Sequence, residues 1–562
     1  MPVLNYQVLI VGLDGATFDL MLPWIEEGRL PHLGQLLRGG ARSRLESTIP
    51  PITPCAWSSF MTGKNPGKHG LFDFIEPDRE GHGFRFTNAS FREGETLWGC
   101  LSRHGRRVGV VNVPMTYPPE PVNGFLISGL DTPHELSPFM YPVEIRHELK
   151  EAGIRYRIDQ QHLGNMRTND RRRQQLTDIF DAESARTKSF RHLSDSRPCD
   201  FRMVVYGATD QVQHHFWHYM DPAHDKHDPA GAKEFQYAIR DTYKHIDRQL
   251  GQLLEECGDD TIVIVMSDHG FGKTSNVRLR LNQVLRDAGL LEFVESNNNG
   301  WMRRAAGWLD GVLRSTLSSD AKRTLAGLLP RLRVWFENLD EAKIDWKRTA
   351  AYVPEAYRSS PAIWLNGGPD GDRDANDMRR QVANLLTALV EKASGERVIS
   401  NCYFPREIYD GPHTSRAPDV LPSWWEDGFL LDQSVPLSGA RPNVERSAAP
   451  IQGGVEFAGS HRLDGVFIAS GGPIRPGFEF ENAQIIDVAP TVLYLMGIPI
   501  PDDMDGRVLT EALDEDYVAD HPIQWESAGV DEINDSFSAP QEFTENESEL
   551  IARRLQSLGY IS

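Results

Sequence analysis

A set of aspartates and histidines, scattered along the chain, has the residue types that bind divalent metal ions. Each aspartate follows a short apolar run. One histidine comes four residues after an aspartate, one directly after another aspartate, and the last lies in the glycine-rich stretch AGSHRLDG. The set is Asp14, Asp210, His214, Asp268, His269 and His461. Carboxylate and imidazole ligands suit zinc, and manganese also accepts them. Each residue alone has a plainer explanation, as a helix cap or an ordinary surface or core residue.

Thr53 is the candidate nucleophile. It stands in PPITPCAWSSFMTG directly before Pro54, and the residues that follow are compatible with a helix. Threonine at the N-cap and proline at the first helical position make a common helix start, which is a sufficient explanation of Thr53 on its own. A helix N-terminus also binds anions, and a hydroxyl beside metal ions can be deprotonated and directed at a bound phosphate. The chemistry expected of Thr53 is therefore attack on phosphorus.

The sequence indicates an α/β fold for the elements that position these residues. Short apolar runs alternate with helix-like stretches, which predicts a central, mostly parallel β-sheet flanked by helices. Several runs are apolar throughout, as expected for strands covered on both faces. Because open α/β sheets place their sites beyond the carboxyl ends of strands, distant residues are expected to meet in one crevice. The expected strands are Val8–Val11, Val108–Val111, Phe125–Ile127, Arg202–Val205, Thr261–Met266 and Val466–Ala469.

The chain divides into four expected parts. Residues 1–275 form the first part of the core, 276–454 an insertion or cap region, 455–515 the closing part of the core, and 516–562 an acidic tail. An apolar stripe at helical spacing, with arginines between, runs through residues 301–317. It is compatible with an insertion helix packed on the core, with a lid over an anionic substrate, or with membrane contact. We expect the tail to be largely irregular and solvated, with a short terminal helix capped at Gly559.

Composition describes an ordinary water-soluble protein of 562 residues, 40% hydrophobic and 25% charged. The longest apolar runs are too short to span a bilayer, and the first residues lack the features of a signal peptide. The five cysteines are scattered and form no C-x-x-C pair, so we expect a reducing, cytoplasmic setting. The net charge of −21 argues against nucleic-acid binding. Thirteen of the carboxylates lie between Glu511 and Glu549, so an anionic substrate is still compatible with the rest.

Taken together and in order, the motifs resemble the alkaline phosphatase superfamily, in its type I phosphodiesterase and nucleotide pyrophosphatase branch. The motifs are LIVGLDG at 9–15, Thr53, TGKNPGKHG at 62–70, D-x-x-x-H at 210–214, SDHG at 267–270, GSH at 459–461 and the closing stretch at 485–509. They span about residues 8 to 510. The resemblance implies an alkaline phosphatase-like core with a cap or insertion region.

The resemblance also implies a role for each residue of the set. One divalent ion is held by Asp210, His214 and His461, and the other by Asp14, Asp268 and His269, with the Thr53 oxygen alongside. The two ions are expected to be zinc, with manganese as the alternative. Attack by Thr53 gives a phospho-threonine that water then hydrolyses. Cations near the site could also contact the phosphate, although the two lysines are equally explained by a surface loop; these weak candidates are Lys64, Lys68 and Arg462.

Several functions stay open at this point. The resemblance favours cleavage of a phosphodiester or pyrophosphate in a small-molecule, lipid or glycan substrate. A phosphomonoesterase or a phosphomutase of the same superfamily is the alternative, and a noncatalytic metal-binding scaffold is a second one. Cys55 is not followed by the C-x-P-x-R pattern of sulfatases, and no G-x-x-x-x-G-K-[ST] loop occurs. The sequence does not indicate the leaving group, the native metals, the oligomeric state or the role of the insertion.

Overall fold

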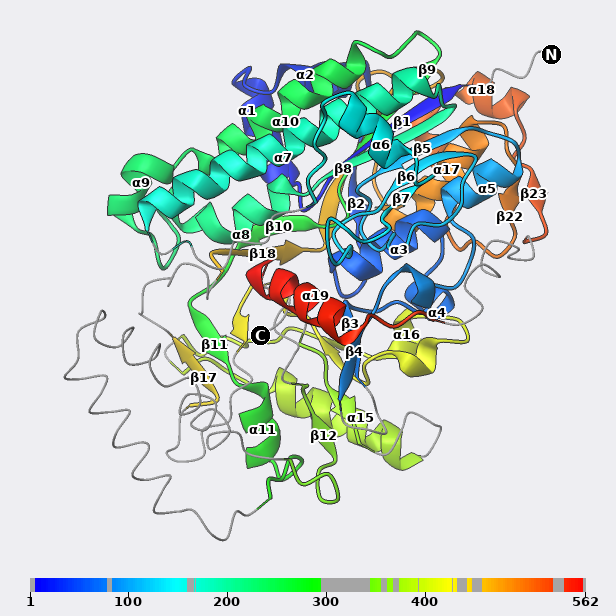
Figure 1. Cartoon of the computed structure of the whole chain (residues 1–562). Helices are drawn as coiled ribbons and strands as arrows, with labels where there is room; N and C mark the ends of the chain where they lie inside the picture. Colours follow the sequence, from blue (N-terminus) through cyan, green and yellow to red (C-terminus); the bar gives the residue numbers. More distant parts are fainter. Residues whose placement is uncertain are drawn as a thin grey trace.

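The computed structural model describes residues 6–77, 83–158, 166, 168–294, 344–354, 361–366, 373–392, 394–426, 428–431, 442–446, 457–528 and 540–558. The amphipathic stripe expected at 301–317, and Gly559 as the cap of the terminal helix, lie outside these residues. Figure 1 shows a large sheet flanked by helices, with a smaller lobe below it.

A ten-stranded sheet forms the centre of the protein, and five neighbouring strands within it are parallel. Strand β19 is antiparallel to both of its neighbours, β2 and β9. All six strands expected from the sequence belong to this sheet, so the predicted α/β fold with a mostly parallel sheet is confirmed. Its order is β20 (Phe478–Glu479), β2 (Gly40–Glu46), β19 (Asp464–Ser470), β9 (Thr261–Met266), β1 (Gln7–Leu13), β8 (Phe201–Tyr206), β5 (Val108–Val111), β6 (Gly124–Ile127) and β7 (Met140–Tyr141), with β21 (Ala483–Gln484) also paired to β2.

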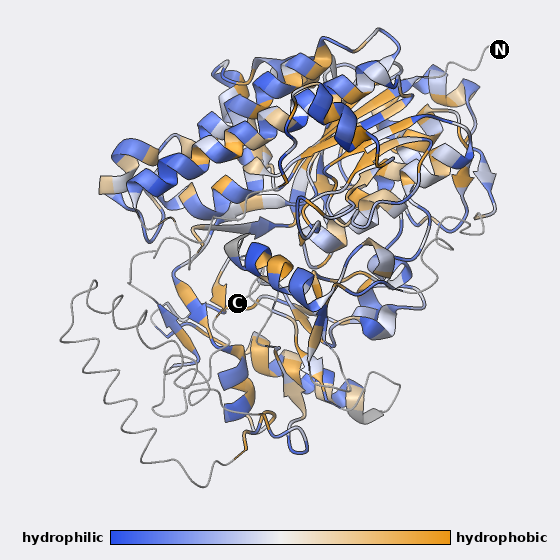
Figure 2. Cartoon of the chain, in the orientation of Figure 1, coloured by the Kyte–Doolittle hydropathy of each residue, from blue (hydrophilic) through white to orange (hydrophobic). Residues whose placement is uncertain are grey.

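The sheet is apolar on both faces because helices cover both. Successive residues of a strand point to opposite sides, so Leu9 and Val11 enter one core cluster and Val8 and Ile10 the other. Figure 2 shows the strands as the most hydrophobic part of the chain. The first cluster includes α1 (Phe18–Glu26), α2 (Pro31–Gly39), α7 (Asn169–Ser196), α8 (Ala208–Met220) and α10 (Ala238–Leu254). The second includes α3 (Thr53–Thr62), α5 (Leu97–Arg103) and α17 (Val488–Leu495).

The lower lobe is built from short elements within the predicted insertion. Its helices among the described residues are α11 (Leu281–Asp287), α15 (Arg373–Thr387) and α16 (Pro405–Ile408). Small sheets join β11 (Val277–Leu279) to β16 (Leu430–Leu431) and β17 (Val444–Arg446), β12 (Ala351–Tyr352) to β13 (Trp364–Leu365), and β14 (Cys402–Tyr403) to β15 (Leu421–Pro422). The domain boundaries proposed from the sequence stay predictions.

The acidic tail is solvated where it is described after residue 515, but it is not irregular there. It forms α18 (Glu515–Asp520) and β23 (Trp525–Glu526), which pairs with β22 (Ile500–Pro501). The terminal helix α19 (Glu545–Leu558) buries Ile551, Arg554 and Leu555 against the core. The expectation of an irregular segment is therefore wrong for α18 and β23, whereas the terminal helix was expected from the sequence.

The remaining described helices and strands are α4 (Pro66–His69), α6 (Ile145–Glu151), α9 (Pro229–Phe235), β3 (Ile75–Pro77), β4 (Phe84–Phe86), β10 (Gly270–Lys273) and β18 (Gly459–Arg462). Among the described helices, none combines the length and the apolar character needed to cross a bilayer.

Candidate active site

Asp210 and His214 lie on one face of α8, as their spacing predicts. His214 Nε2 is 3.2 Å from Asp210 Oδ1. His461 comes to the same place from β18, which pairs with β10 directly after the SDHG motif. Its Nε2 is 3.0 Å from His214 Nε2 and 3.3 Å from Asp210 Oδ1. One carboxylate and two imidazoles from distant parts of the chain thus converge on a single point.

The second group lies at the carboxyl ends of two neighbouring parallel strands. Asp14 follows β1, and Asp268 with His269 follows β9, which pairs with β1. His269 Nε2 is 3.3 Å from Asp268 Oδ2 and 3.7 Å from Asp14 Oδ1. All three side chains are buried, with no more than 4% of any residue exposed. The site therefore occupies the edge at which open α/β sheets bind ligands.

The two groups form one continuous cluster. The rings of His269 and His461 stack with their centroids 3.7 Å apart. Ligand atoms of Asp210, His269 and His461 lie within 4.8 Å of one another, and so do those of Asp14, Asp268 and His269. His269 therefore borders both groups. The structure brings all six expected residues together, while their division between two ions stays a prediction.

Thr53 lies beside this cluster, one position further into its helix than expected. Ile52, in an extended conformation, is the N-cap of α3, so Thr53 is the first helical residue and Pro54 the second. The expectation of Thr53 as N-cap was wrong by one position, because the backbone already turns into the helix at Thr53. Thr53 is fully buried, and its Oγ1 is 3.4 Å from His269 Nε2. Its hydroxyl thus faces the group formed by Asp14, Asp268 and His269.

The tautomers of the histidines leave their Nε2 atoms available to a metal ion. Each Nδ1 lies near a backbone carbonyl oxygen, at 2.9 Å for His214, 2.8 Å for His461 and 3.1 Å for His269. A carbonyl only accepts, so each Nδ1 carries a hydrogen, and each Nε2 is the nitrogen that can bind a metal ion once it has lost its own hydrogen. The Nε2 atoms of His214 and His461, 3.0 Å apart, cannot then bond to each other. A cation shared between them would satisfy both.

The carboxylates of the cluster also indicate a site for a cation. Burial and the neighbouring carboxylates raise the pKa of Asp14 well above its usual range, and burial together with Asp210 does the same to the pKa of Asp268. Burial also opposes charge on Asp210, but His214 and His461 outweigh it and hold its pKa well below the usual range. In the described part of the chain, no hydrogen-bond donor reaches Asp14 Oδ1 or Asp268 Oδ2. Buried acceptors of this kind fit a divalent cation.

A second layer of hydrogen bonds fixes the loop that carries Asp14, and sequence reasoning missed it. Gln213, between Asp210 and His214 on α8, donates from Nε2 to Gly15 O at 2.8 Å. Tyr243 Oη donates to Gln213 Oε1 at 3.3 Å and accepts from the Thr17 amide at 3.3 Å. Trp57 Nε1 donates to Asp14 Oδ2 at 3.4 Å. The position of Gln213 between two ligands was the only sequence signal for this layer.

The three cations proposed as phosphate contacts are engaged within the protein. Lys64 pairs with Asp503 and is buried rather than exposed on a loop. Lys68 Nζ is 2.5 Å from Asp505 Oδ1. Arg462 donates to the carbonyl of Lys273 at 2.5 Å and to the carbonyl of His461 at 2.8 Å. These contacts hold loops together, and a role in binding phosphate stays a prediction for all three.

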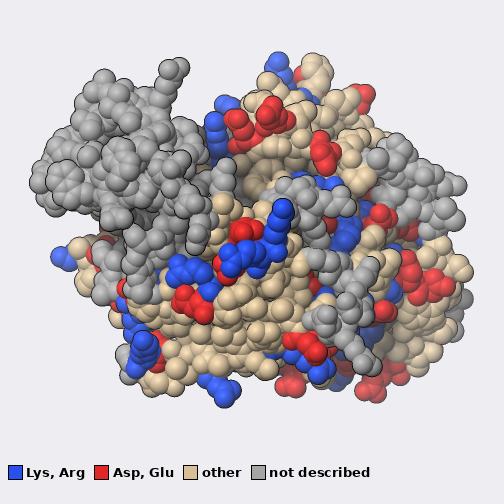
Figure 3. All heavy atoms as spheres, turned by 90° about the horizontal axis from the view of Figure 1, so that it is seen from below, with Lys and Arg blue, Asp and Glu red and all other residues tan. Residues whose placement is uncertain are grey.

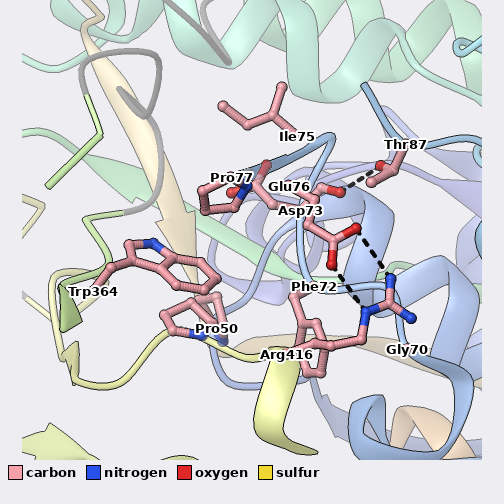
Figure 4. A pocket seen from close by; sticks show the side chains of 11 residues that line it. Pro50, Gly70, Phe72, Asp73, Ile75, Glu76, Pro77, Thr87, Trp364 and Arg416 are labelled. Atoms are coloured by element: carbon pink, nitrogen blue, oxygen red, sulfur yellow. Dashed lines mark hydrogen bonds and ion pairs between the residues drawn. The ribbon is translucent and has the colours of Figure 1, made fainter. Parts of the chain in front are cut away.

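A narrow crevice lies next to the segment that leads to Thr53 (Figure 4). Its lining residues from the core and the lower lobe are Pro50, Gly70, Phe72, Asp73, Ile75, Glu76, Pro77, Thr87, Trp364, Arg416 and Pro418. Arg416 closes it by donating to both oxygens of Glu76, at 2.9 and 3.1 Å. Its volume, about 10 Å³, has room for about one water molecule. The described walls therefore leave no room there for a substrate group.

Comparisons with known proteins give one matching family. The model of the family "Type I phosphodiesterase / nucleotide pyrophosphatase" matches residues 8–422. No curated protein matches. Among solved structures, murine ectonucleotide pyrophosphatase/phosphodiesterase 5 has a TM-score of 0.48 at 12% identity, over 90% of this chain and 100% of that one. An inactive variant of the murine protein in complex with AMP has a TM-score of 0.48 at 13% identity, over 91% and 100%. The human protein has a TM-score of 0.47 at 14% identity, over 92% and 99%.

Proposed function

The chain belongs to the type I phosphodiesterase/nucleotide pyrophosphatase family and is a phosphoester hydrolase, and we propose that it works with two divalent metal ions and Thr53 as nucleophile. One observation carries the proposal: the hydroxyl of Thr53 is buried 3.4 Å from His269, within a cluster of three carboxylates and three histidines. Carboxylates in such contact need cations, and a buried hydroxyl beside them is placed to react.

The ligands expected for one ion are Asp210, His214 and His461, and for the other Asp14, Asp268 and His269. When bound, the ions would lower the pKa of the Thr53 hydroxyl and offset the charge of the phosphate. We favour zinc and keep manganese as the alternative.

Thr53 performs the chemical step in this proposal. Its Oγ loses its proton and forms a bond to phosphorus while the bond from phosphorus to the leaving oxygen breaks. This gives a phospho-threonine and releases an alcohol or a phosphate, whose oxygen takes up a proton. Water then attacks the same phosphorus and regenerates the Thr53 hydroxyl. The contact between the Thr53 hydroxyl and His269 supports this scheme, because it places the hydroxyl where bound metal ions would activate it.

The substrate that we propose is a phosphodiester or pyrophosphate of a small molecule, lipid or glycan, in agreement with the family description. A phosphomonoesterase or phosphomutase is the alternative, and a metal-binding scaffold without turnover is the second. We also propose a cytoplasmic location, which the five free cysteines support.

Hydrolysis of bis-p-nitrophenyl phosphate and of p-nitrophenyl phosphate, with zinc, with manganese and with chelator, tests the proposal. We expect metal-dependent preference for the diester, abolished in Thr53→Ala although metal content is unchanged. Thr387→Ala is the matched control, since its hydroxyl donates only within α15 of the lower lobe. A fully active Thr53→Ala protein would disprove the mechanism. Preference for the monoester would favour the alternative, and two bound metals without turnover would favour the scaffold.

A further inference from the structure

A second polar cavity lies on the lower lobe, formed by α15, α16 and the short 3₁₀ turn Thr414–Arg416. Its volume is about 200 Å³, large enough for a small ligand rather than a single water molecule. The lining includes three arginines and three side chains with neutral hydrogen-bonding groups: Asn376, Arg379, Arg380, Arg406, Thr414 and Ser415. None of these residues belongs to the cluster around Thr53.

Arg379 forms a fixed wall of the cavity. Its Nη2 and Nε are 2.6 and 3.1 Å from Asp419 Oδ1, and its Nη1 donates to Asn376 Oδ1 at 3.0 Å. Asp419 is itself held, because its other oxygen accepts from the Leu365 amide at 2.8 Å. Arg379 is 9% exposed. The guanidinium is therefore preorganised, and the Asn376 amide keeps its NH₂ group as a donor.

Arg380 and Arg406 give the cavity its charge. Both are exposed, and neither forms an ion pair with any residue of the described ranges. The cavity also has two carboxylates, but Asp419 is neutralised by Arg379, which leaves Glu407 against two guanidinium groups. Figure 3 shows Lys and Arg mixed with Asp and Glu over the described part of the lower face. Recognition by this cavity would thus come from local contacts rather than from a broad positive field.

We propose that this cavity binds a small anion with a phosphoryl group, separately from the site of hydrolysis. Guanidinium groups match phosphoryl oxygens in bidentate geometry, and a set of arginines with amide and hydroxyl groups is suited to a tetrahedral anion. The shared chemistry is the phosphoryl group, either of inorganic phosphate or of a phosphorylated organic molecule. The inference does not depend on Thr53 or on the metal ions.

Equilibrium dialysis of the metal-loaded full chain with radiolabelled inorganic phosphate tests the proposal. We expect the Arg380→Gln/Arg406→Gln chain to bind one phosphate fewer, or to bind it at least tenfold more weakly, because removing one charged hydrogen bond to phosphate weakens binding by about a factor of ten. Arg286→Gln, in a half-buried arginine paired with its neighbour Asp287, is the control and should bind as the wild type does. Wild-type stoichiometry and affinity in the double variant would overturn the proposal.

Two further measurements separate the sources of the anion and the two sites. Phenylphosphonate, which is not hydrolysed, is added to the wild type with labelled phosphate bound. If the natural ligand is a phosphorylated organic molecule, phenylphosphonate should displace the phosphate held by this cavity. If the phosphate resists displacement, the ligand is inorganic phosphate. The same loss should occur in a Thr53→Ala background, so the result stands even if the proposed hydrolysis fails. If the loss disappears in that background, the phosphate belongs to the Thr53 site and the proposal is wrong.

Discussion

At the scale of single residues, Asp210 has a different environment from the other two carboxylates of the cluster. His214 and His461 contact one of its oxygens, at 3.2 and 3.3 Å, whereas Asp14 and Asp268 face each other and His269. Asp210 is therefore the residue whose change should affect one group of ligands most selectively.

We predict that Asp210→Asn lowers the metal content by about one ion per chain and reduces the hydrolysis rate by at least about a hundredfold. The amide is a poor replacement for a charged ligand between two imidazoles. Metal content by mass spectrometry, together with turnover of bis-p-nitrophenyl phosphate, is the measurement. Asp241→Asn, on the exposed side of α10, should change neither quantity. Unchanged metal content in Asp210→Asn would contradict the ligand assignment.

The sequence was informative about the residues of the cluster around Thr53 and uninformative about the contacts that hold the surrounding loops. Asp14, Asp268 and Thr53 were recognisable because each stands in a motif of fixed local spacing. The Lys64–Asp503 contact was not, because 439 positions separate its partners. Nothing local distinguishes a lysine that pairs internally from one that awaits a phosphate.

At the scale of elements, Tyr243 couples α10 to α8 and to the loop after β1. Its hydroxyl donates to Gln213 and accepts from the Thr17 amide, both at 3.3 Å. This hydroxyl thus helps set the distance between the Asp14 loop and the helix that carries Asp210 and His214.

We predict that Tyr243→Phe lowers the free energy of unfolding by about 1–2 kcal/mol and also weakens metal binding, because a buried amide and Gln213 lose their partner. Urea unfolding and zinc titration measure the two effects. Tyr494→Phe is the matched control, since it loses one hydrogen bond to the His521 carbonyl far from the site. Tyr494→Phe should lower the free energy of unfolding and leave the zinc affinity unchanged. Equal zinc affinity in both variants would argue against a positioning role for Tyr243.

Asp131, after β6, is a second buried group that holds a loop. Its carboxyl accepts hydrogen bonds from the amides of Met115, Thr116 and Tyr117, at 2.9, 3.3 and 2.8 Å. Burial nevertheless raises the pKa of Asp131 to about 6. The folded state therefore binds this proton more tightly than the unfolded state does, and the contribution of Asp131 to stability falls as the pH rises through 6.

We predict that the stability of the wild type relative to Asp131→Asn falls by about 3 kcal/mol between pH 4 and pH 7, since Asn does not titrate. Urea unfolding of both proteins across this range is the measurement. The comparison cancels the other carboxylates, which titrate equally in both chains. A constant difference, or one that grows with pH, would show that the carboxyl keeps an ordinary pKa in the folded state.

At the scale of the whole molecule, the central sheet could be predicted and the lower lobe could not. Strands such as Thr261–Met266 are apolar throughout, and this pattern predicts burial on both faces of the sheet. In the lobe, β12 and β13 have two residues each and are paired across a separation of more than ten positions. Such short strands carry no periodicity of their own, and only tertiary packing defines them.

The terminal helix α19 joins the end of the chain to the core. In Figure 1 it lies between the large sheet and the lower lobe. Arg554, 1% exposed, donates from Nη1 to the carbonyl of Leu130 at 3.0 Å, contacts that of Thr132, and donates from Nη2 to that of Pro133 at 3.3 Å. The neighbouring Arg553 is exposed and pairs only across one helical turn with Glu549, at 3.5 Å.

These two adjacent arginines provide a matched test of how α19 is held. We predict that Arg554→Leu lowers the free energy of unfolding by about 3 kcal/mol and exposes α19 to limited proteolysis, because three buried carbonyls lose a charged donor. Arg553→Leu should change stability by less than about 0.5 kcal/mol and leave proteolysis as in the wild type. The initial rate of diester hydrolysis should be retained in both, since neither arginine belongs to the cluster around Thr53. If Arg554→Leu instead abolishes hydrolysis while the fold and metal content persist, α19 takes part in the site and is not merely its support.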